Sequence, residues 1–403
     1  MLNGVILVVA LLLGAYLAFS KRLAGSSNWQ ATVTPLASIM GSGFLVSAPL
    51  LAGIVGNLAV FAMGVLLLLA YLVGGAIRFN IQHFEPIENT KQNKHAQDTA
   101  FLSRIVLVGA YFISITYYLQ LLAAFLLKIL HVDSPLWANV ITTALLVMIG
   151  VVGMWRGLQE LAAIEKYAVA LNLGMIGALL VALLIYNVKL LIGGDWALPA
   201  LSSAIDFHDV RVLFGLLIVV QGFEISRYLG DEYPAKQRIA TMRAAQLLSA
   251  AIYAVFLALT TVLFRKGLGA DVTAIIDMTR PVAAILPALL AVAAIGSQFS
   301  AAVADDSGAG GLLEDITQKK LPVRHAYLLI LLVTVALTWV TDVNAIIAYA
   351  SRAFALFYMF QCVVAFLVAR ELEDLSHRVP KLVHYAFLAF MCFLVFAIGV
   401  PSG

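Results

Sequence analysis

The chain has 403 residues, of which 63% are hydrophobic and only 12% are charged, and its mean hydropathy is +0.99. This composition excludes a soluble globular protein, and we therefore expect a polytopic membrane protein. The net charge of +3 is small and the basic residues stand singly or in pairs, so no nucleic-acid-binding patch is indicated.

Twelve apolar stretches are long enough to cross a bilayer, which takes about 17 residues or more. We interpret the first as a retained helix rather than a signal peptide, because no basic residue precedes it and no A-x-A-like site follows it. The stretches predict an extra N-terminal helix in 1–24, five helices in 31–190, five more in 209–370 and a C-terminal helix in 381–403. They lie at about 2–20, 31–54, 57–77, 101–129, 135–155, 160–188, 209–230, 241–264, 281–312, 325–341, 343–369 and 382–400.

The loops between these stretches differ in charge. If the first loop is cytoplasmic, 18 of the 25 Lys and Arg residues fall on that side and six on the other, with Arg352 inside a span. Basic residues collect in cytoplasmic loops, so both termini are expected outside, in the cytoplasmic (inner) membrane of a bacterium. The longest polar stretch, 79–100, lies on the predicted cytoplasmic side and is expected to be a linker.

Two of the spans are interrupted by glycine at mid-depth: Gly41-Ser42-Gly43 in SIMGSGFLVSAPL at 38–50, and Gly222 in LIVVQGFEISRYLGDEYP at 217–234. An unpaired backbone N–H or C=O in hydrocarbon costs several kcal/mol, so a helix breaks only where protein, ligand or water meets the freed groups. The exposed amides suit an anion and the exposed carbonyls a cation. Such a pair of breaks therefore predicts a binding site, and a zwitterion would fit it.

Apart from the first helix, each set of five spans opens with a broken helix, and the odd number forces the two sets into opposite orientations. The segments 41–77 (GSGFLVSAPL and onward) and 221–246 (QGFEISRYLGDEYPAKQRIATMRAAQ) resemble the first two and the sixth core helices of the amino acid–polyamine–organocation (APC) superfamily. The resemblance implies an all-α membrane protein with the 5+5 inverted repeat of the leucine transporter (LeuT) fold, broken first and sixth core helices, and one extra helix at each end. The extra first helix, IRFNIQHFEP at 77–86 and GLLEDITQKK at 311–320 are similar to sodium/solute symporters.

The residues expected to hold a solute lie at the breaks and on the third core helix. The amides of Gly41, Ser42 and Gly43 would hold a carboxylate or other anion, with close helix packing as the alternative. The opposite wall would consist of Gln221, Gly222, Phe223 and Glu224, where Glu224 either binds a cation or proton or simply caps the helix. On the third core helix, Tyr111 and Tyr118 share one face and either line the site or pack.

The resemblance also implies where a coupling ion would bind. In the sodium site shared by this fold, carbonyls of Ala37 and Met40 would meet the hydroxyls of Ser297 and Ser300. Gln298 follows Ser297 where adjacent hydroxyls are usual. In proton-coupled permeases a lysine on the fifth core helix can replace the ion, and alignment of AIEKYAVALNL at 163–173 places Asn172 there. Sodium and proton coupling both stay open.

Three further ionisable residues lie within predicted spans. Arg352 needs a partner near mid-depth, and the candidates are Glu224, Asp305 or a solute carboxylate, most simply as a structural or gating ion pair. Asp305 and Asp306, toward the cytoplasmic end of their helix, are interpreted either as the wall of a solvated vestibule or as an ion or proton relay.

These features predict a secondary active transporter that moves a small organic solute, an amino acid or related amine, by alternating access with Na⁺ or H⁺. The expected partners are the solute, the coupling ion and the bilayer, with no cofactor besides Na⁺. No phosphate loop, HExxH or serine elbow occurs, so no enzyme is expected, and Cys362 and Cys392 are interpreted as core residues. The alternatives are a membrane sensor with a transporter fold and an inorganic-ion carrier or channel.

Overall fold

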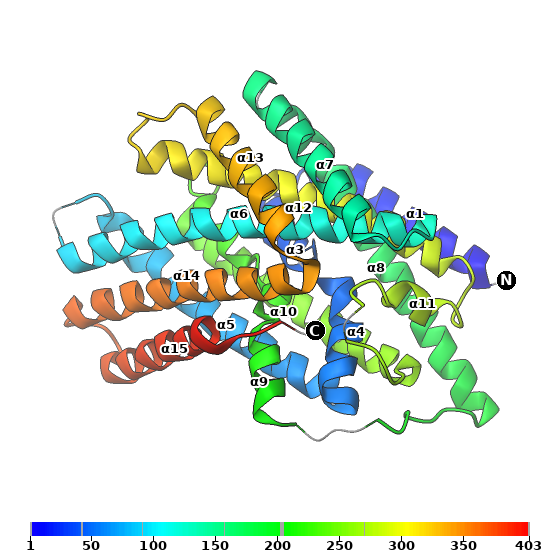
Figure 1. Cartoon of the computed structure of the whole chain (residues 1–403). Coiled ribbons are helices and arrows are strands. Elements are labelled where there is room, and N and C mark those ends of the chain that lie inside the picture. The colour runs from blue at the N-terminus through cyan, green and yellow to red at the C-terminus, as the bar shows by residue number, and fades with distance from the viewer. Residues whose placement is uncertain are drawn as a thin grey trace.

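The computed structural model describes residues 2–41, 43–90, 92–156, 158–201, 205–269 and 271–401. These residues form long helices joined by short turns (Figure 1). The α-helices are α1 Leu2–Phe19, α2 Lys21–Ala24, α3 Ser27–Gly41, α4 Phe44–Val55, α5 Ala59–His83, α6 Lys94–Leu130, α7 Pro135–Arg156, α8 Gln159–Gly193, α9 Phe207–Phe214, α10 Ala235–Thr260, α11 Ile275–Thr279, α12 Leu286–Ile316, α13 Val323–Val340, α14 Val343–Glu371 and α15 Arg378–Ile398. Short 3₁₀ turns are η1 Gly56–Leu58, η2 Glu85–Ile87, η3 Leu217–Val220, η4 Phe223–Tyr228 and η5 Thr261–Leu263.

Ten helical segments of the described chain are long and apolar enough to cross a membrane. One of them, Phe44–Ile87, joins α4 to α5. The two interrupted segments are α3 with α4 and α9 with η3 and η4. Their first pieces, α3 with 15 residues and α9 with 8, are too short to qualify alone and correspond to the remaining predicted crossings. The predicted all-α membrane fold with two broken core helices is therefore confirmed.

The helices of the two five-helix sets make equivalent contacts, as an inverted repeat requires. The long helix α6 runs through the bundle between α12 and α14 (Figure 1) and packs against both. Its counterpart in the second set, α12, packs against α6 and α8. Likewise α6 contacts α7 while α12 contacts α13, and α7 contacts α13. Each of these contacts therefore has a counterpart between the equivalent helices of the other set: α6 with α14 corresponds to α12 with α8, and α6 with α7 corresponds to α12 with α13.

The two extra helices attach to opposite parts of this core. α1 packs on α8 at a close approach of small residues, where a Cβ on Gly174 would lie 2.8 Å from the carbonyl oxygen of Ala10 and from Cα of Gly14. α15 packs on α14. Cys362 of α14 and Cys392 of α15 are both free and fully buried, so the prediction that they are core residues is confirmed.

Candidate functional site

The two helix breaks are in direct contact at the centre of the bundle. Gly222 has φ +114°, a backbone conformation that glycine adopts without strain, and a Cβ there would clash with Ser38 and lie 2.7 Å from the amide nitrogen of Ile39. At the other break, a Cβ on Gly43 would lie 2.7 Å from Cγ1 of Val219. Both glycines are therefore required by the close approach of one main chain to the other. Ser42 lies outside the described residues.

Side chains from the second set of helices form hydrogen bonds with the backbone carbonyls freed at the first break. The hydroxyl of Tyr253 on α10 lies 3.3 Å from the carbonyl oxygen of Ile39 and also contacts that of Val219. Nε2 of Gln298 on α12 donates to the carbonyl of Gly41 at 2.9 Å. The resemblance predicts a hydroxyl at position 298. The amide of Gln298 instead binds a carbonyl freed at the first break. Sequence reasoning gave Tyr253 no role, because only its contacts across the bundle reveal one.

The second break is satisfied in the same way. Oγ of Ser351 on α14 accepts from the amide of Ile218 at 2.9 Å and donates to the carbonyl of Gly215 at 2.7 Å. One hydroxyl therefore joins a freed donor to a freed acceptor across the unwound segment. Ser351 is fully buried, and sequence reasoning missed it because a single serine in an apolar helix gives no distinguishing signal.

Glu224 lies within this arrangement as a cap. Its Oε2 accepts from the amide of Gly222 at 2.9 Å and from the hydroxyl of Tyr358 at 2.7 Å, and the residue is only 2% exposed. Phe223 stacks on the same Tyr358 ring, with centroids 5.1 Å apart. In this conformation the Glu224 carboxylate accepts hydrogen bonds from protein donors. This arrangement matches the expectation that Glu224 caps the helix, rather than the alternative that it binds a cation or proton.

The two tyrosines of α6 separate in space. Tyr118 reaches the second break, where its hydroxyl accepts from Nε2 of Gln221 at 2.8 Å. Tyr111 packs edge-on against Phe354, at 6.1 Å between centroids, and a Cβ on Gly308 would lie 3.3 Å from its ring. Tyr118 thus contacts the second break, whereas the contacts of Tyr111 are those of a packing residue.

A small cavity of about 30 Å³ lies beside the first break, between α3, α8, η4 and α12. Its size suits one water molecule or one ion. Nδ2 of Asn172 donates to Oγ of Ser297 at 3.2 Å across it. The predicted coupling residues in its wall are Ala37, Asn172, Ser297, Ser300 and Asp305. Met40 is buried elsewhere and does not line this cavity.

Asp305, the carboxylate in the cavity wall, is hydrogen-bonded by a serine of α6. Oγ of Ser114 makes a close hydrogen bond to Oδ2 of Asp305, which is 8% exposed. The neighbouring Asp306 is 4% exposed. Helix packing thus buries both carboxyls in this conformation, with Asp305 in the wall of the small cavity.

Among the described residues, no carboxylate forms an ion pair with Arg352, although one was expected. Its Nε donates to the carbonyl of Phe396 at 2.7 Å, and its guanidinium lies 5.8 Å from that residue's ring centroid. Phe396 lies in the last turn of α15, where carbonyls lack helical partners. The expected pairing with Glu224 or Asp305 is corrected by this contact: Arg352 caps a helix end instead.

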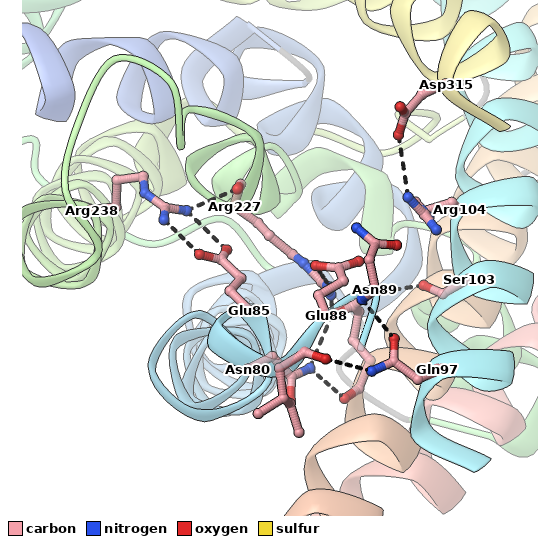
Figure 2. Close-up of polar contacts among 12 residues, drawn as sticks. Asn80, Glu85, Glu88, Asn89, Gln97, Ser103, Arg104, Arg227, Arg238 and Asp315 are labelled. Atoms are coloured by element: carbon pink, nitrogen blue, oxygen red, sulfur yellow. Dashed lines mark hydrogen bonds and ion pairs between the residues drawn. The ribbon is translucent and has the colours of Figure 1, made fainter. Parts of the chain in front are cut away.

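A network of buried charges lies at the start of α6, on the predicted cytoplasmic side (Figure 2). Arg238 at the start of α10 binds Glu85 at 2.6 Å, and Arg227 of η4 lies 3.6 Å from Glu88. Both arginine side chains are only 5% exposed. The stretch 79–100 is therefore more than the expected linker, because its carboxylates join η4 and α10 to the turn that follows α5.

Gln361 of α14 joins this network to two further helices. Its Oε1 makes a close contact with Arg227 and accepts from Nδ2 of Asn80 at 3.1 Å, while its Nε2 donates to Ser103 at 2.8 Å. At the surface, Arg104 pairs with Asp315 at 3.2 Å (Figure 2). Together these contacts close the bundle at this end.

The opposite end of α6 opens into a cleft of about 860 Å³. Lys128 crosses it to Asp277 at 2.8 Å and to Asp271 at 3.4 Å. The hydrogen bond from Lys128 lowers the pKa of Asp277 below its ordinary value. The two ends of α6 therefore differ: one is closed by buried ion pairs, and the other carries a charged, open cleft.

Comparison with known proteins agrees with this architecture. A family model described as "APC superfamily transporter" matches residues 21–399. An "Uncharacterized protein" of Aquifex aeolicus (strain VF5) is 42% identical over 388 residues, which cover 94% of this chain and 93% of that one. Among solved structures, a mutant manganese transporter of Eremococcus coleocola superposes with a TM-score of 0.55 at 12% identity, over 92% of this chain and 87% of that one. The chain belongs to the APC superfamily of transporters.

Proposed function

We propose that this transporter moves a small organic solute, an amino acid or a related amine, by alternating access driven by Na⁺ or H⁺. The observation that carries the proposal is the contact of the two helix breaks, whose freed backbone groups are held by protein side chains. These groups form a site that is closed in this conformation and becomes available when the side chains withdraw.

The chemistry of the occupied groups supports a zwitterionic solute. Withdrawal of Tyr253 and Gln298 would release the carbonyls of Ile39 and Gly41, which suit an ammonium group. Withdrawal of Glu224 would release the amide of Gly222, which suits a carboxylate. A primary amine and a carboxylate on one small molecule would therefore replace internal hydrogen bonds with equivalent ones.

The cavity beside the first break is the proposed place for a coupling cation. Asp305 supplies a negative charge, and Ser297, Ser300 and Asn172 supply neutral oxygen donors in the same wall. Hydroxyl, amide and carboxylate oxygens together suit a hard cation such as Na⁺, whereas the carboxylate alone suits a proton.

An inorganic-ion carrier is the second candidate, because the structural relative is named a manganese transporter. In the described part of the chain, no group of three or more His, Cys, Asp and Glu residues could hold a metal ion. Divalent transition metals prefer such clustered ligands, so this observation favours the organic solute.

Uptake by purified protein in liposomes tests the proposal. Amino acids, amines and Mn²⁺ are offered in turn under an imposed Na⁺ gradient, an imposed pH gradient and neither, with protein-free liposomes as the blank. We expect gradient-driven uptake of at least one amino acid or amine. Uptake of Mn²⁺ alone would establish the second candidate, and no uptake of any amino acid or amine would refute the first.

The coupling ion is assigned with two variants. If Na⁺ is the ion, Ser300→Ala should raise the Na⁺ concentration needed for half-maximal uptake by about tenfold, the loss expected for a ligand bond of about 1.4 kcal/mol. Ser47→Ala is the control: Ser47 is fully buried whereas Ser300 is half-buried, and the Ser47 hydroxyl bonds within its own helix, to the carbonyl of Phe44. An equal effect in both variants would show that Ser300 acts through folding alone.

A further inference from the structure

The open cleft at the predicted outer end of α6 is separate from the central site. Its wall consists of the last turns of α6, the first turns of α7 and α12, the segment 271–280 that contains α11, and the turn between α13 and α14. No described residue of the two interrupted helices, α3 with α4 and α9 with η3 and η4, belongs to this wall. Its volume of about 860 Å³ is that of a small-molecule site.

Gln120 of α6 contributes an unpaired hydrogen-bond acceptor to this wall. The residue lines the cleft and is only 4% exposed. Its Nε2 donates to the carbonyls of Thr338 and Thr341 at 3.3 and 3.4 Å. These contacts fix the orientation of the amide, and Oε1 is buried without a hydrogen-bond partner in the described part of the chain. A buried acceptor without a partner is unfavourable, and a donor on a bound molecule would remove that cost.

The charged side chains of the wall favour a cationic ligand. Four aspartates line the cleft, whereas the permanent cations in its wall are two, Lys128 and Arg280. Both cations already pair with Asp277, at 2.8 and 3.2 Å. The wall therefore keeps an excess of negative charge after these ion pairs have formed. The four aspartates are Asp133, Asp271, Asp277 and Asp342.

The rest of the wall favours an organic cation over a metal ion. In the described part of the chain, no group of three or more His, Cys, Asp and Glu residues could hold a metal ion. The ammonium of Lys128 also contacts both Asp271 and Asp277, so these carboxylates already have a cation. Apolar side chains line much of the remaining wall and would be covered by an apolar ligand body. They include Ala124, Leu127, Val272, Ile276 and Ala288.

We propose that this cleft is a second binding site, and that its ligand is an organic amine with an apolar body. The N–H groups of the amine supply the donor that Gln120 lacks, and its positive charge offsets the aspartates of the wall. The apolar body covers the apolar part of the wall. This binding site does not depend on the proposed transport function.

One wall of the cleft also packs on the first broken helix, which gives the site a consequence for transport. A Cβ on Gly53 of α4 would lie 2.1 Å from the carbonyl oxygen of Leu268, shortly before Asp271, and α11 contacts α4. The opposite wall belongs to α6 and α7. An amine bound between the two walls would hold α4 to α6 and oppose the movement of one set of helices against the other. We therefore expect bound amine to inhibit transport, and this role rests on the proposed function.

Isothermal titration calorimetry of the purified protein tests the site with 2-phenylethylamine as the probe, an amine that is protonated at neutral pH. The neutral 2-phenylethanol and the anionic phenylacetate carry the same ring and serve as comparisons. We expect the amine to bind at least about tenfold more tightly than either, because only the amine offers a charged donor. Equal affinity for the alcohol, tighter binding of phenylacetate, or no binding of the amine would overturn the proposal.

Two variants test whether the probe binds in the cleft. Gln120→Leu removes the unpaired acceptor and should weaken amine binding by about tenfold or more. Its matched control is Asn187→Leu, since Asn187 is also buried and donates to helix carbonyls but does not line the cleft. Asp342→Asn removes one negative charge while asparagine keeps the cap of α14, and should weaken binding by about threefold. Its matched control is Asp206→Asn, at the cap of α9 outside the cleft.

The outcomes separate the cleft from the central site. Asp342→Asn carries the test if Gln120→Leu does not fold, because the helix cap is retained. Tyr253→Phe, which loses a hydroxyl at the first break, should bind the amine as the wild-type protein does. Affinity that falls in Tyr253→Phe but in neither cleft variant would assign the amine to the central site and overturn the proposal. An equal loss in each cleft variant and its control would also overturn it.

Uptake into liposomes tests the inhibitory role. External 2-phenylethylamine should lower the maximal rate of solute uptake without changing the solute concentration for half-maximal rate, and Asp342→Asn should need about threefold more amine for the same inhibition. Inhibition that excess solute relieves would refute this role. Because calorimetry needs no solute, binding in the cleft without uptake of any amino acid or amine would refute the transport proposal and leave the second site standing.

Discussion

Replacement of Gly222 by alanine tests the contact of the two helix breaks directly. The added Cβ would clash with Ser38 and lie 2.7 Å from the amide nitrogen of Ile39. In addition, φ +114° at this position lies in a region that L-residues rarely adopt. Gly222→Ala must therefore strain its own backbone and push η4 away from α3.

The size of the effect follows from these two terms. A backbone held in a sparsely populated region costs about 1–3 kcal/mol. Overpacking at a closely packed contact costs about 1–3 kcal/mol more, and relief of the overlap requires a movement of roughly 0.7 Å to restore an ordinary contact of about 3.4 Å. We therefore expect Gly222→Ala to lower the free energy of unfolding by about 2–6 kcal/mol.

Thermal unfolding of the purified protein, together with liposome uptake, measures both consequences. Gly296→Ala is the matched control, because Gly296 is also on a core helix but a Cβ there meets nothing within 4 Å. That control should be neutral or slightly stabilising, since alanine favours a helix over glycine by about 1 kcal/mol. Wild-type stability and uptake in Gly222→Ala would refute the close contact of the breaks.

Three further predictions concern the ends of the bundle. Arg238→Ala breaks a buried ion pair and should cost about 3 kcal/mol, whereas Arg104→Ala, at the surface pair, should cost less than about 1 kcal/mol; equal losses in chemical unfolding would contradict the network of buried charges. The Lys128 hydrogen bond lowers the pKa of Asp277 from 3.8. This carboxylate therefore stabilises the fold fully above its unfolded pKa, and less as pH falls through its lower folded pKa. The difference in thermal midpoint between wild type and Asp277→Asn should be constant from about pH 5 to 7 and shrink below about pH 4; a difference that grows on acidification would contradict this prediction. Arg352→Ala should reduce the yield of folded protein more than solute affinity, because its contact is with the end of α15; normal yield with abolished binding would assign it to the solute.

The amino-acid sequence determined the fold class. Apolar length, glycine at mid-depth and the odd number of spans in each set are local or additive properties, and they predicted the broken helices and the inverted packing of α6 and α12. The sequence also selected Ala37, Asn172, Ser297, Ser300 and Asp305, which the structure brings to one cavity wall. The resemblance set this register from helix order and break positions, and the role of these residues in ion coupling stays a prediction.

Only the tertiary structure decided what meets the freed backbone groups and which charges are paired. Tyr253 reaches the carbonyl of Ile39 across 214 positions, and Gln298 reaches Gly41 across 257, so no local pattern could identify them. The same reason explains Arg352, whose partner is the end of α15 rather than a carboxylate. It also explains the adjacent acids Asp305 and Asp306, because helix packing places Oδ2 of Asp305 on Ser114 and leaves Oδ1 of Asp306 without a hydrogen-bond partner in the described part of the chain. Burial and pairing are properties of the packed bundle, and hydropathy along the chain does not encode them.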